Sequence, residues 1–257
     1  MKLSSIKINI LIVLYKKKLE DSLAYNSLKN NQLFNKIINI VIWNNSPEIF
    51  ISKHLDYFEG ENDKLSKIYN RMIDKYICND NEYLMISDYD TDYSMYDFNL
   101  LSSILINNNA GIFIPKLYVN EQLVSPAKRF LFKGYYLNYI REGFIPSKNI
   151  IGMNSGIIIT NICKCKLNIC FDERLNFYGT DTDFFIRYER YFDKLYILPL
   201  EALHDLSENN HDLSRDNFRK KDSLYALKII FENLPFIHKI LFNIYISYLY
   251  FKFKLRG

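Results

Sequence analysis

The stretch Tyr83-Leu84-Met85-Ile86-Ser87-Asp88-Tyr89-Asp90-Thr91-Asp92 decides the fold class. Its first five residues are mostly apolar, which is typical of a buried strand. Carboxylates then stand at every second position, at Asp88, Asp90 and Asp92. Neighbouring carboxylates disfavour each other's charge unless a cation neutralises them, and Mg²⁺ and Mn²⁺ prefer oxygen ligands. The pattern predicts a cation site at the carboxyl end of a strand, where open α/β sheets bind ligands. A solvated acidic turn is the alternative.

Strand-like and helix-like segments alternate around this stretch. We expect strands at 8–15, 37–43, 83–87, 111–115, 157–160 and 195–198, and helices at 19–29, 64–76, 95–106 and 184–191. Residues 117–150 are rich in aromatics and turns and show no regular period. The alternation predicts a mainly parallel, Rossmann-like sheet flanked by helices, with right-handed crossovers.

Length and charge limit the possible functions. The chain has 257 residues, enough for one large α/β domain or one domain with a tail. Its 33 basic and 29 acidic residues leave a net charge of +4, which does not indicate a nucleic-acid-binding protein. The apolar run at residues 10–15 is too short for a signal peptide, and no segment is long enough to span a bilayer.

A second acidic cluster, Gly179-Thr180-Asp181-Thr182-Asp183, precedes the expected helix at 184–191. Acidic residues at the start of a helix commonly cap it, so a purely structural role is one interpretation. The other is a general base that accepts a proton from a hydroxyl nucleophile. His204 follows the last expected strand, where it is either a metal ligand or an ordinary loop residue.

Together these segments resemble bacterial family 2 glycosyltransferases of the GT-A fold. The matching segments stand in the family's order over about residues 7–210: Ile10–Tyr15, Val41–Ser46, Asn62–Arg71, Ser87–Thr91 (the DxD motif), Asn154–Gly156, Phe171–Leu175 and Gly179–Phe184. Three positions depart from the family pattern: Asn44 replaces the usual Asp, Lys64 the usual Gly, and Thr180 a common Glu. The acidic-helix motif is also found in a rhamnosyltransferase-like branch.

The resemblance implies a role for each matching residue. It places Asp88 and Asp90 on a divalent cation, Mg²⁺ or Mn²⁺, bound to the diphosphate of a nucleotide-sugar, with Asp90 as the direct ligand and Asp88 nearer the ribose. It makes His204 the third metal ligand and Asp181 the catalytic base of a single, inverting displacement. The remaining nucleotide-sugar contacts that it implies are Tyr15, Asn44, Lys67, Asn154, Ser155 and Gly156.

The same resemblance divides the chain. We assign residues 1–222 to a GT-A catalytic domain, with a nucleotide-sugar half over about 1–116 and an acceptor half over about 117–222. Residues 223–257 form a helical tail. After Glu232 the tail has no acidic residue and carries seven aromatics: Phe236, Phe242, Tyr245, Tyr248, Tyr250, Phe251 and Phe253. It is therefore expected either to lie in a membrane interface or to pack on the domain or a second copy.

These observations lead to one expected function and two alternatives. We expect a metal-dependent glycosyltransferase of surface-polysaccharide synthesis, such as O-antigen or capsule. Its expected partners are a nucleotide-sugar donor, a glycan or lipid-linked acceptor and the cytoplasmic face of the membrane. A nucleotidyltransferase is one alternative, although residues 14–16 lack the glycines of its signature. A non-catalytic carbohydrate-binding protein is the other.

Overall fold

A computed structural model describes residues 6–33, 36–46, 48, 56–205 and 213–255. Its main sheet contains β1 (Lys7–Leu14), β2 (Ile38–Asn44), β3 (Asp56–Glu59), β4 (Glu82–Asp88), β5 (Thr91–Asp92), β6 (Ile112–Val119), β7 (Gln122–Ser125), β10 (Gly143–Pro146), β12 (Ile158–Ile159) and β13 (Lys194–His204). A smaller sheet contains β8 (Ala127–Phe130), β9 (Lys133–Tyr135) and β11 (Ile150–Ile151). The helices are η1 (Leu19–Asp21), α1 (Leu23–Leu28), α2 (Leu65–Tyr76), α3 (Phe98–Asn107), α4 (Asn161–Leu167), α5 (Thr180–Tyr188), α6 (Leu213–Ile230) and α7 (Phe236–Leu255).

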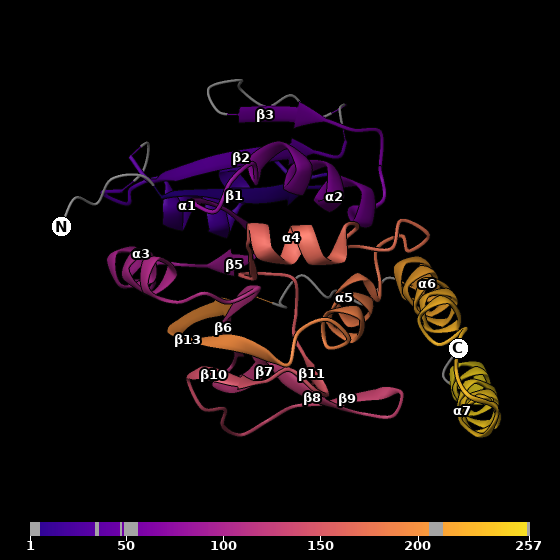
Figure 1. The fold of residues 1–257 in the computed structure, drawn as a ribbon. Coiled ribbons are helices and arrows are strands. Elements are labelled where there is room, and N and C mark those ends of the chain that lie inside the picture. The colour runs from indigo at the N-terminus through magenta and orange to yellow at the C-terminus, as the bar shows by residue number, and fades with distance from the viewer. Residues whose placement is uncertain (1–5, 34–35, 47, 49–55, 206–212, 256–257) are drawn as a thin grey trace.

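The central sheet is mixed and runs in the order β10-β13-β6-β12-β4-β1-β2-β3 (Figure 1). The half formed by β4, β1, β2 and β3 is entirely parallel, and β6 pairs in parallel with β13. The short β12 separates these two parallel parts and is antiparallel to both neighbours. The predicted fold class, an α/β sheet flanked by helices with a C-terminal helix, is confirmed.

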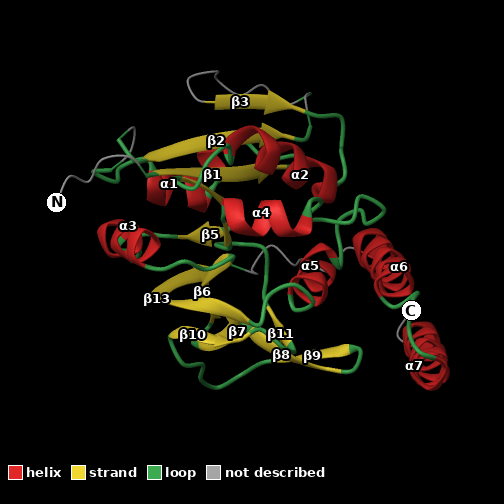
Figure 2. Cartoon of the chain, viewed as in Figure 1, coloured by secondary structure: helices red, strands yellow, loops and turns green. Residues whose placement is uncertain are grey.

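Helices flank the strands of the sheet (Figure 2). Two apolar clusters cover its two faces. Side chains of β1 alternate between them: Ile10 and Ile12 belong to the cluster with α1 and α3, whereas Leu11 belongs to the one with α2, α4 and α5. Because strand side chains point alternately to opposite faces, the continuous apolar run of β1 predicts burial on both sides. A sheet buried in this way holds its loop-forming carboxyl edge rigidly, which is the edge that carries Asp88.

The structure corrects several predicted elements. The helix expected at 19–29 is interrupted at Ser22, whose side chain caps α1 by accepting the N–H of Tyr25 at 3.2 Å. Residues 117–150 are not irregular, because they hold β7 to β10 and the end of β6. The expected strand at 195–198 extends over eleven residues to His204, and β3 was not expected.

α6 and α7 pack beside α5 through a third apolar cluster that includes Ile186, Phe231 and Phe242. The domain boundary expected at residue 222 falls inside α6. The predicted tail aromatics do not all face outward, because Phe242 is buried and Tyr245 and Phe253 are half-buried. Among the described residues, each helix is too short or too polar to span a bilayer.

Candidate active site

Strand pairing brings the acidic turn and His204 together. β4 ends at Asp88, the chain turns through Asp90, and Thr91 in β5 pairs with His204 at the end of β13. His204 Nδ1 lies 3.5 Å from Asp90 Oδ1. Asp88, Asp90 and His204 each offer a ligand atom, and these atoms lie within 4.8 Å of one another. His204 is therefore the buried last residue of a long strand and not an ordinary loop residue.

A network of hydroxyl groups contacts Asp88 and His204 of the candidate metal-binding cluster. Ser155 Oγ accepts the backbone N–H of Asp88 at 3.0 Å and lies 2.7 Å from Thr91 Oγ1. Thr91 Oγ1 is 3.0 Å from His204 Nδ1. Tyr93 donates to Ser87 Oγ at 3.0 Å. Ser155 is predicted from the sequence as a nucleotide-sugar contact, and that role stays a prediction. Thr91 and Tyr93 are not predicted, because the contacts of Thr91 with His204 and of Tyr93 with Ser155 join residues far apart in the chain.

The electrostatics of the cluster fit a bound cation. Burial, and then the charge of Asp90, raise the pKa of Asp88 to about 6. The ionised form of Asp88 is thus disfavoured where it stands, and nearby positive charge would restore it. Two carboxylates and one imidazole form a donor set that suits a divalent metal such as Mn²⁺. The three residues therefore fit the predicted metal site.

Asp181 lies close to this cluster, in the first turn of α5. The helix begins after Gly179, which adopts φ +78° and whose missing Cβ leaves room for Ala226 of α6. The charges of Asp88 and Asp181 both raise the pKa of the buried Tyr69, after the larger effect of its burial. Burial raises the pKa of Asp181, and its Oδ1 accepts the N–H of Thr182 at 2.7 Å. Among the described residues, the Asp181 carboxylate accepts its hydrogen bonds from its neighbour Thr182. The helix is capped at Gly179 without a side-chain bond, so Asp181 is not its capping residue.

Asp183 is in a different situation, although it lies only two residues away. Arg187 Nε donates to Asp183 Oδ2 at 2.8 Å, and Arg187 also donates to the carbonyls of Ile169 and Cys170. Burial raises the pKa of Asp183 even though Arg187 opposes the shift. Because its carboxylate is engaged in this ion pair, Asp183 has a structural role that Asp181 lacks.

Asn154 and Gly156 connect the cluster to α5. Asn154 Nδ2 donates to Thr180 Oγ1 at 3.0 Å, whereas its buried Oδ1 has no hydrogen-bond partner among the described residues. Gly156 adopts φ +79° and donates its N–H to the carbonyl of Ile86 at 2.7 Å. A Cβ at Gly156 would lie 2.5 Å from Pro115 Cγ. The segment 154–156 therefore holds the turn that follows β4 against the start of α5.

The other predicted nucleotide contacts lie farther from this network. Asn44 is buried at the end of β2, donates to Tyr57 OH at 3.0 Å and accepts the N–H of Ser46. Tyr15 is 43% exposed just after β1, and Lys67 is exposed in the first turn of α2. Among the described residues, no hydrogen bond or ion pair joins Tyr15 or Lys67 to the acidic cluster. Their predicted roles remain predictions.

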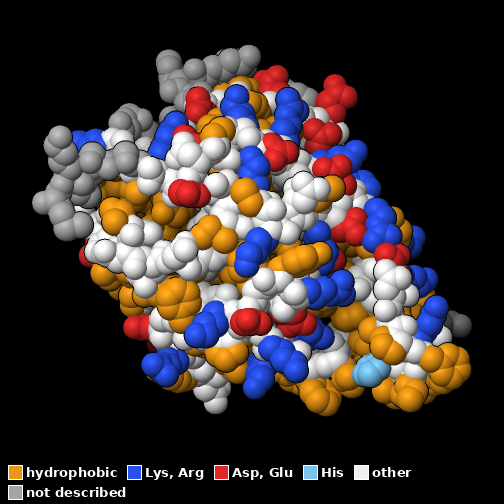
Figure 3. Space-filling model, in the orientation of Figure 1, with side chains coloured by type: hydrophobic (Ala, Val, Ile, Leu, Met, Phe, Trp, Pro, Cys, Tyr) orange, Lys and Arg blue, Asp and Glu red, His pale blue; other side chains and the backbone are white. Residues whose placement is uncertain are grey.

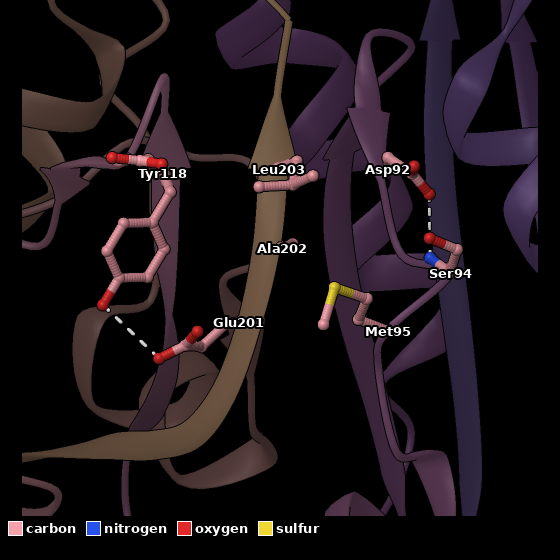
Figure 4. Close-up of a pocket in the computed structure, with 8 residues that line it drawn as sticks. Asp92, Ser94, Met95, Tyr118, Glu201, Ala202 and Leu203 are labelled. Carbon is pink, nitrogen blue, oxygen red and sulfur yellow. Dashed lines mark hydrogen bonds between the residues drawn. The ribbon is translucent and has the colours of Figure 1, made fainter.

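A cavity of about 330 Å³ adjoins the end of β13 and is lined by Asp92, Ser94, Met95, Tyr118, Glu121, Glu201, Ala202 and Leu203 (Figure 4). Tyr118 OH donates to Glu201 Oε1 at 3.4 Å, and Asp92 accepts the N–H of Ser94 at 2.8 Å. The volume is at the lower end of the range for ligand sites. Leu203 and Asp92 are paired next to His204 and Thr91, so the cavity lies one residue from the cluster.

The sheet order, the acidic turn after β4 and the β5–β13 pairing are consistent with the expected GT-A fold. Comparison with solved structures agrees. S. aureus TarS 1–349 in complex with UDP-GlcNAc has a TM-score of 0.56 at 14% identity, covering 96% of this chain and 73% of that one. GalNAc-T7 with UDP, GalNAc and Mn²⁺ has a TM-score of 0.60 at 12% identity, covering 92% of this chain and 49% of that one. No protein-family model and no curated protein sequence matches the chain.

Proposed function

We propose that the chain is a metal-dependent glycosyltransferase that uses a nucleotide-sugar donor. The observation that carries the proposal is the convergence of Asp88, Asp90 and His204 at the carboxyl end of β4. Two similar structures, TarS and GalNAc-T7, contain UDP-GlcNAc in one case and UDP, GalNAc and Mn²⁺ in the other. These ligands belong to those proteins and support the proposal through the shared fold.

The chain's residues divide the chemistry as follows. Asp181 accepts the proton of an acceptor hydroxyl, whose oxygen attacks the anomeric carbon while the bond from that carbon to the diphosphate oxygen breaks. A buried carboxylate with a raised pKa suits this task, because a general base works best when its pKa is near the working pH. A divalent cation held by Asp88, Asp90 and His204 would supply positive charge to the departing diphosphate. The single displacement inverts the configuration of the sugar.

The finer parts of the proposal rest on the resemblance and the sequence pattern. They are a glycan or lipid-linked acceptor, a place in surface-polysaccharide synthesis such as O-antigen or capsule, and a position at the cytoplasmic membrane face. Membership of the rhamnosyltransferase-like branch is a proposal of the same kind.

The test is donor binding read by thermal shift, with a panel of nucleotide-sugars in the presence and absence of Mn²⁺. We expect one donor to raise the melting temperature only when Mn²⁺ is present, and Asp90→Ala to abolish that rise together with sugar transfer. Asp92→Asn is the matched control, because Asp92 lies outside the metal-binding cluster but in the same acidic turn.

Three outcomes would contradict the proposal. Full transfer by Asp90→Ala, or by the wild type in excess EDTA, would remove the metal from the mechanism. If the Mn²⁺-dependent rise in melting temperature were lost in Asp92→Asn and kept in Asp90→Ala, Asp92 and not Asp90 would be the metal ligand. Binding of nucleoside triphosphates with release of pyrophosphate would indicate the nucleotidyltransferase alternative.

A further inference from the structure

α7 exposes a face that is as apolar as the face it buries. Phe242 and Ile246 pack into the third apolar cluster. Side chains at three- and four-residue spacing on the opposite side of the helix are 44–71% exposed: Ile237, Ile240, Leu241, Ile244, Tyr248 and Phe251. An ordinary surface helix turns charged or polar residues outward. A continuous apolar face in this position indicates a contact with something outside the described chain.

The hairpin of β8 and β9 extends this apolar surface. Phe132, in the turn between the two strands, packs against Phe231, Phe242 and Tyr245 with ring centroids 5.1, 5.2 and 5.7 Å apart. On either side of Phe132, Phe130 and Tyr135 are 67% and 48% exposed. Figure 3 shows apolar side chains gathered at the end of the molecule where α7 and this hairpin lie. The hairpin and α7 are therefore one packed unit.

The charges of this unit have a single sign. Neither residues 122–141 nor residues 233–255 contain an Asp or Glu. Lys128, Lys133 and Lys239 are exposed in these segments. Two neighbouring carboxylates are already engaged: Glu189 lies 2.7 Å from Arg129, and Glu232 lies 2.7 Å from Arg174. The apolar surface is thus bordered by cations without a compensating row of anions.

We propose that the outward face of α7 and the β8–β9 hairpin form one surface that binds an anionic lipid bilayer. The inference deepens the membrane contact in the proposed function and rests on it. Apolar side chains would enter the headgroup boundary while lysines at the border attract the headgroups. A second copy of the chain fits less well, because a two-fold contact would press this cationic surface against itself.

Because α7 packs on the hairpin, membrane binding cannot be tested by removing α7 alone. Truncation before Phe236 would uncover Phe231 and Phe132, so loss of binding after truncation could reflect loss of packing. Substitutions of exposed side chains avoid that problem. Two variants address the two parts separately: Ile240→Ser with Ile244→Ser on α7, and Phe130→Ser with Tyr135→Ser on the hairpin. Ile106→Ser with Tyr191→Ser is the matched control, because both side chains are similarly exposed elsewhere.

The measurement is flotation of the full-length protein with phosphatidylglycerol-containing vesicles and with pure phosphatidylcholine vesicles, at low and high salt. We expect binding to the anionic vesicles only, weakened by salt. Each double variant should lower the partition coefficient at least tenfold, and the control should not change it. Lys133→Ala and Lys239→Ala should each lower it about fivefold, since a lysine near the surface contributes about 1 kcal/mol.

The inference would be overturned if the wild-type protein did not bind anionic vesicles at low salt. The inference would also be overturned if the α7 variant lost vesicle binding and the hairpin variant bound like the wild type. The binding surface would then be α7 alone. A dimer in sedimentation that Ile240→Ser with Ile244→Ser converts to a monomer, without vesicle binding, would assign the face to a second copy. Mn²⁺-dependent donor binding is measured on each variant, and its persistence separates failure of this inference from failure of the proposed function.

Discussion

The side chain of Ser155 accepts the backbone N–H of Asp88 at 3.0 Å, although 67 residues separate them. The same oxygen lies 2.7 Å from Thr91 Oγ1. Ser155 thereby fixes both the end of β4 and the start of β5, the two points between which Asp90 is held. The loop between β11 and β12 thus sets the geometry of the acidic turn.

Ser155→Ala should weaken Mn²⁺-dependent donor binding about 10- to 100-fold, the usual effect of losing a group that orients metal ligands. The cause is a backbone N–H of Asp88 left without its acceptor. Titration of the thermal shift with Mn²⁺ measures the effect. Ser155→Thr keeps the hydroxyl and serves as the conservative comparison. Equal Mn²⁺ titrations of Ser155→Ala and wild type would show that Ser155 does not orient the metal ligands.

Asp181→Asn and Asp183→Asn should have different effects on activity and similar effects on stability. Asp181→Asn should lower turnover by about 10²–10⁴-fold while donor binding persists. Because burial raises the pKa of Asp181, its charged form destabilises the fold at neutral pH, so this variant should melt at the same temperature or higher.

Asp183→Asn should instead keep turnover, because the Asp183 carboxylate is held by Arg187. Burial raises the pKa of Asp183 as well, even against Arg187, so removing its charge should not lower the melting temperature. Turnover, measured on both variants, separates the two roles, and the melting temperatures check that both variants are folded. An inactive Asp183→Asn beside an active Asp181→Asn would reverse the assignment.

The pH dependence of transfer should report the ionisation of Asp181. The base acts only when deprotonated, and burial raises its pKa above the ordinary value near 3.8. Activity should therefore be lost as pH falls, with a midpoint above that of an exposed aspartate. Saturating Mn²⁺ is needed, because the pKa of Asp88, at about 6, makes protons compete with the metal. A rate that is flat down to pH 4 would exclude Asp181 as the base.

Gly156→Ala should destabilise the protein more than Gly143→Ala. Both glycines have positive φ, at +79° and +84°, so both substitutions strain the backbone by about 1–2 kcal/mol. Only at Gly156 would the new Cβ also meet Pro115, at 2.5 Å, whereas the space beside Gly143 is open. Thermal melting compares the two. Equal melting temperatures would show that Pro115 moves aside freely.

The sequence by itself determined the layered α/β fold, because strands buried on both faces leave long apolar runs such as 8–14 that need no partner to be recognised. It also pointed to Asp88 and Asp90, since a local pattern of apolar residues followed by alternate carboxylates carries the signal.

Only the tertiary structure decided which distant groups complete the site. His204 and Thr91 come together because β5 pairs with β13. Ser155 reaches the site because the loop after β11 contacts the end of β4. Likewise, the periodicity of α7 shows apolar residues all round the helix, and packing against Phe132 and Phe231 selects which of them turn inward. Contacts between residues so far apart in the chain leave no local pattern, because their energy comes from the packed fold and not from the segment.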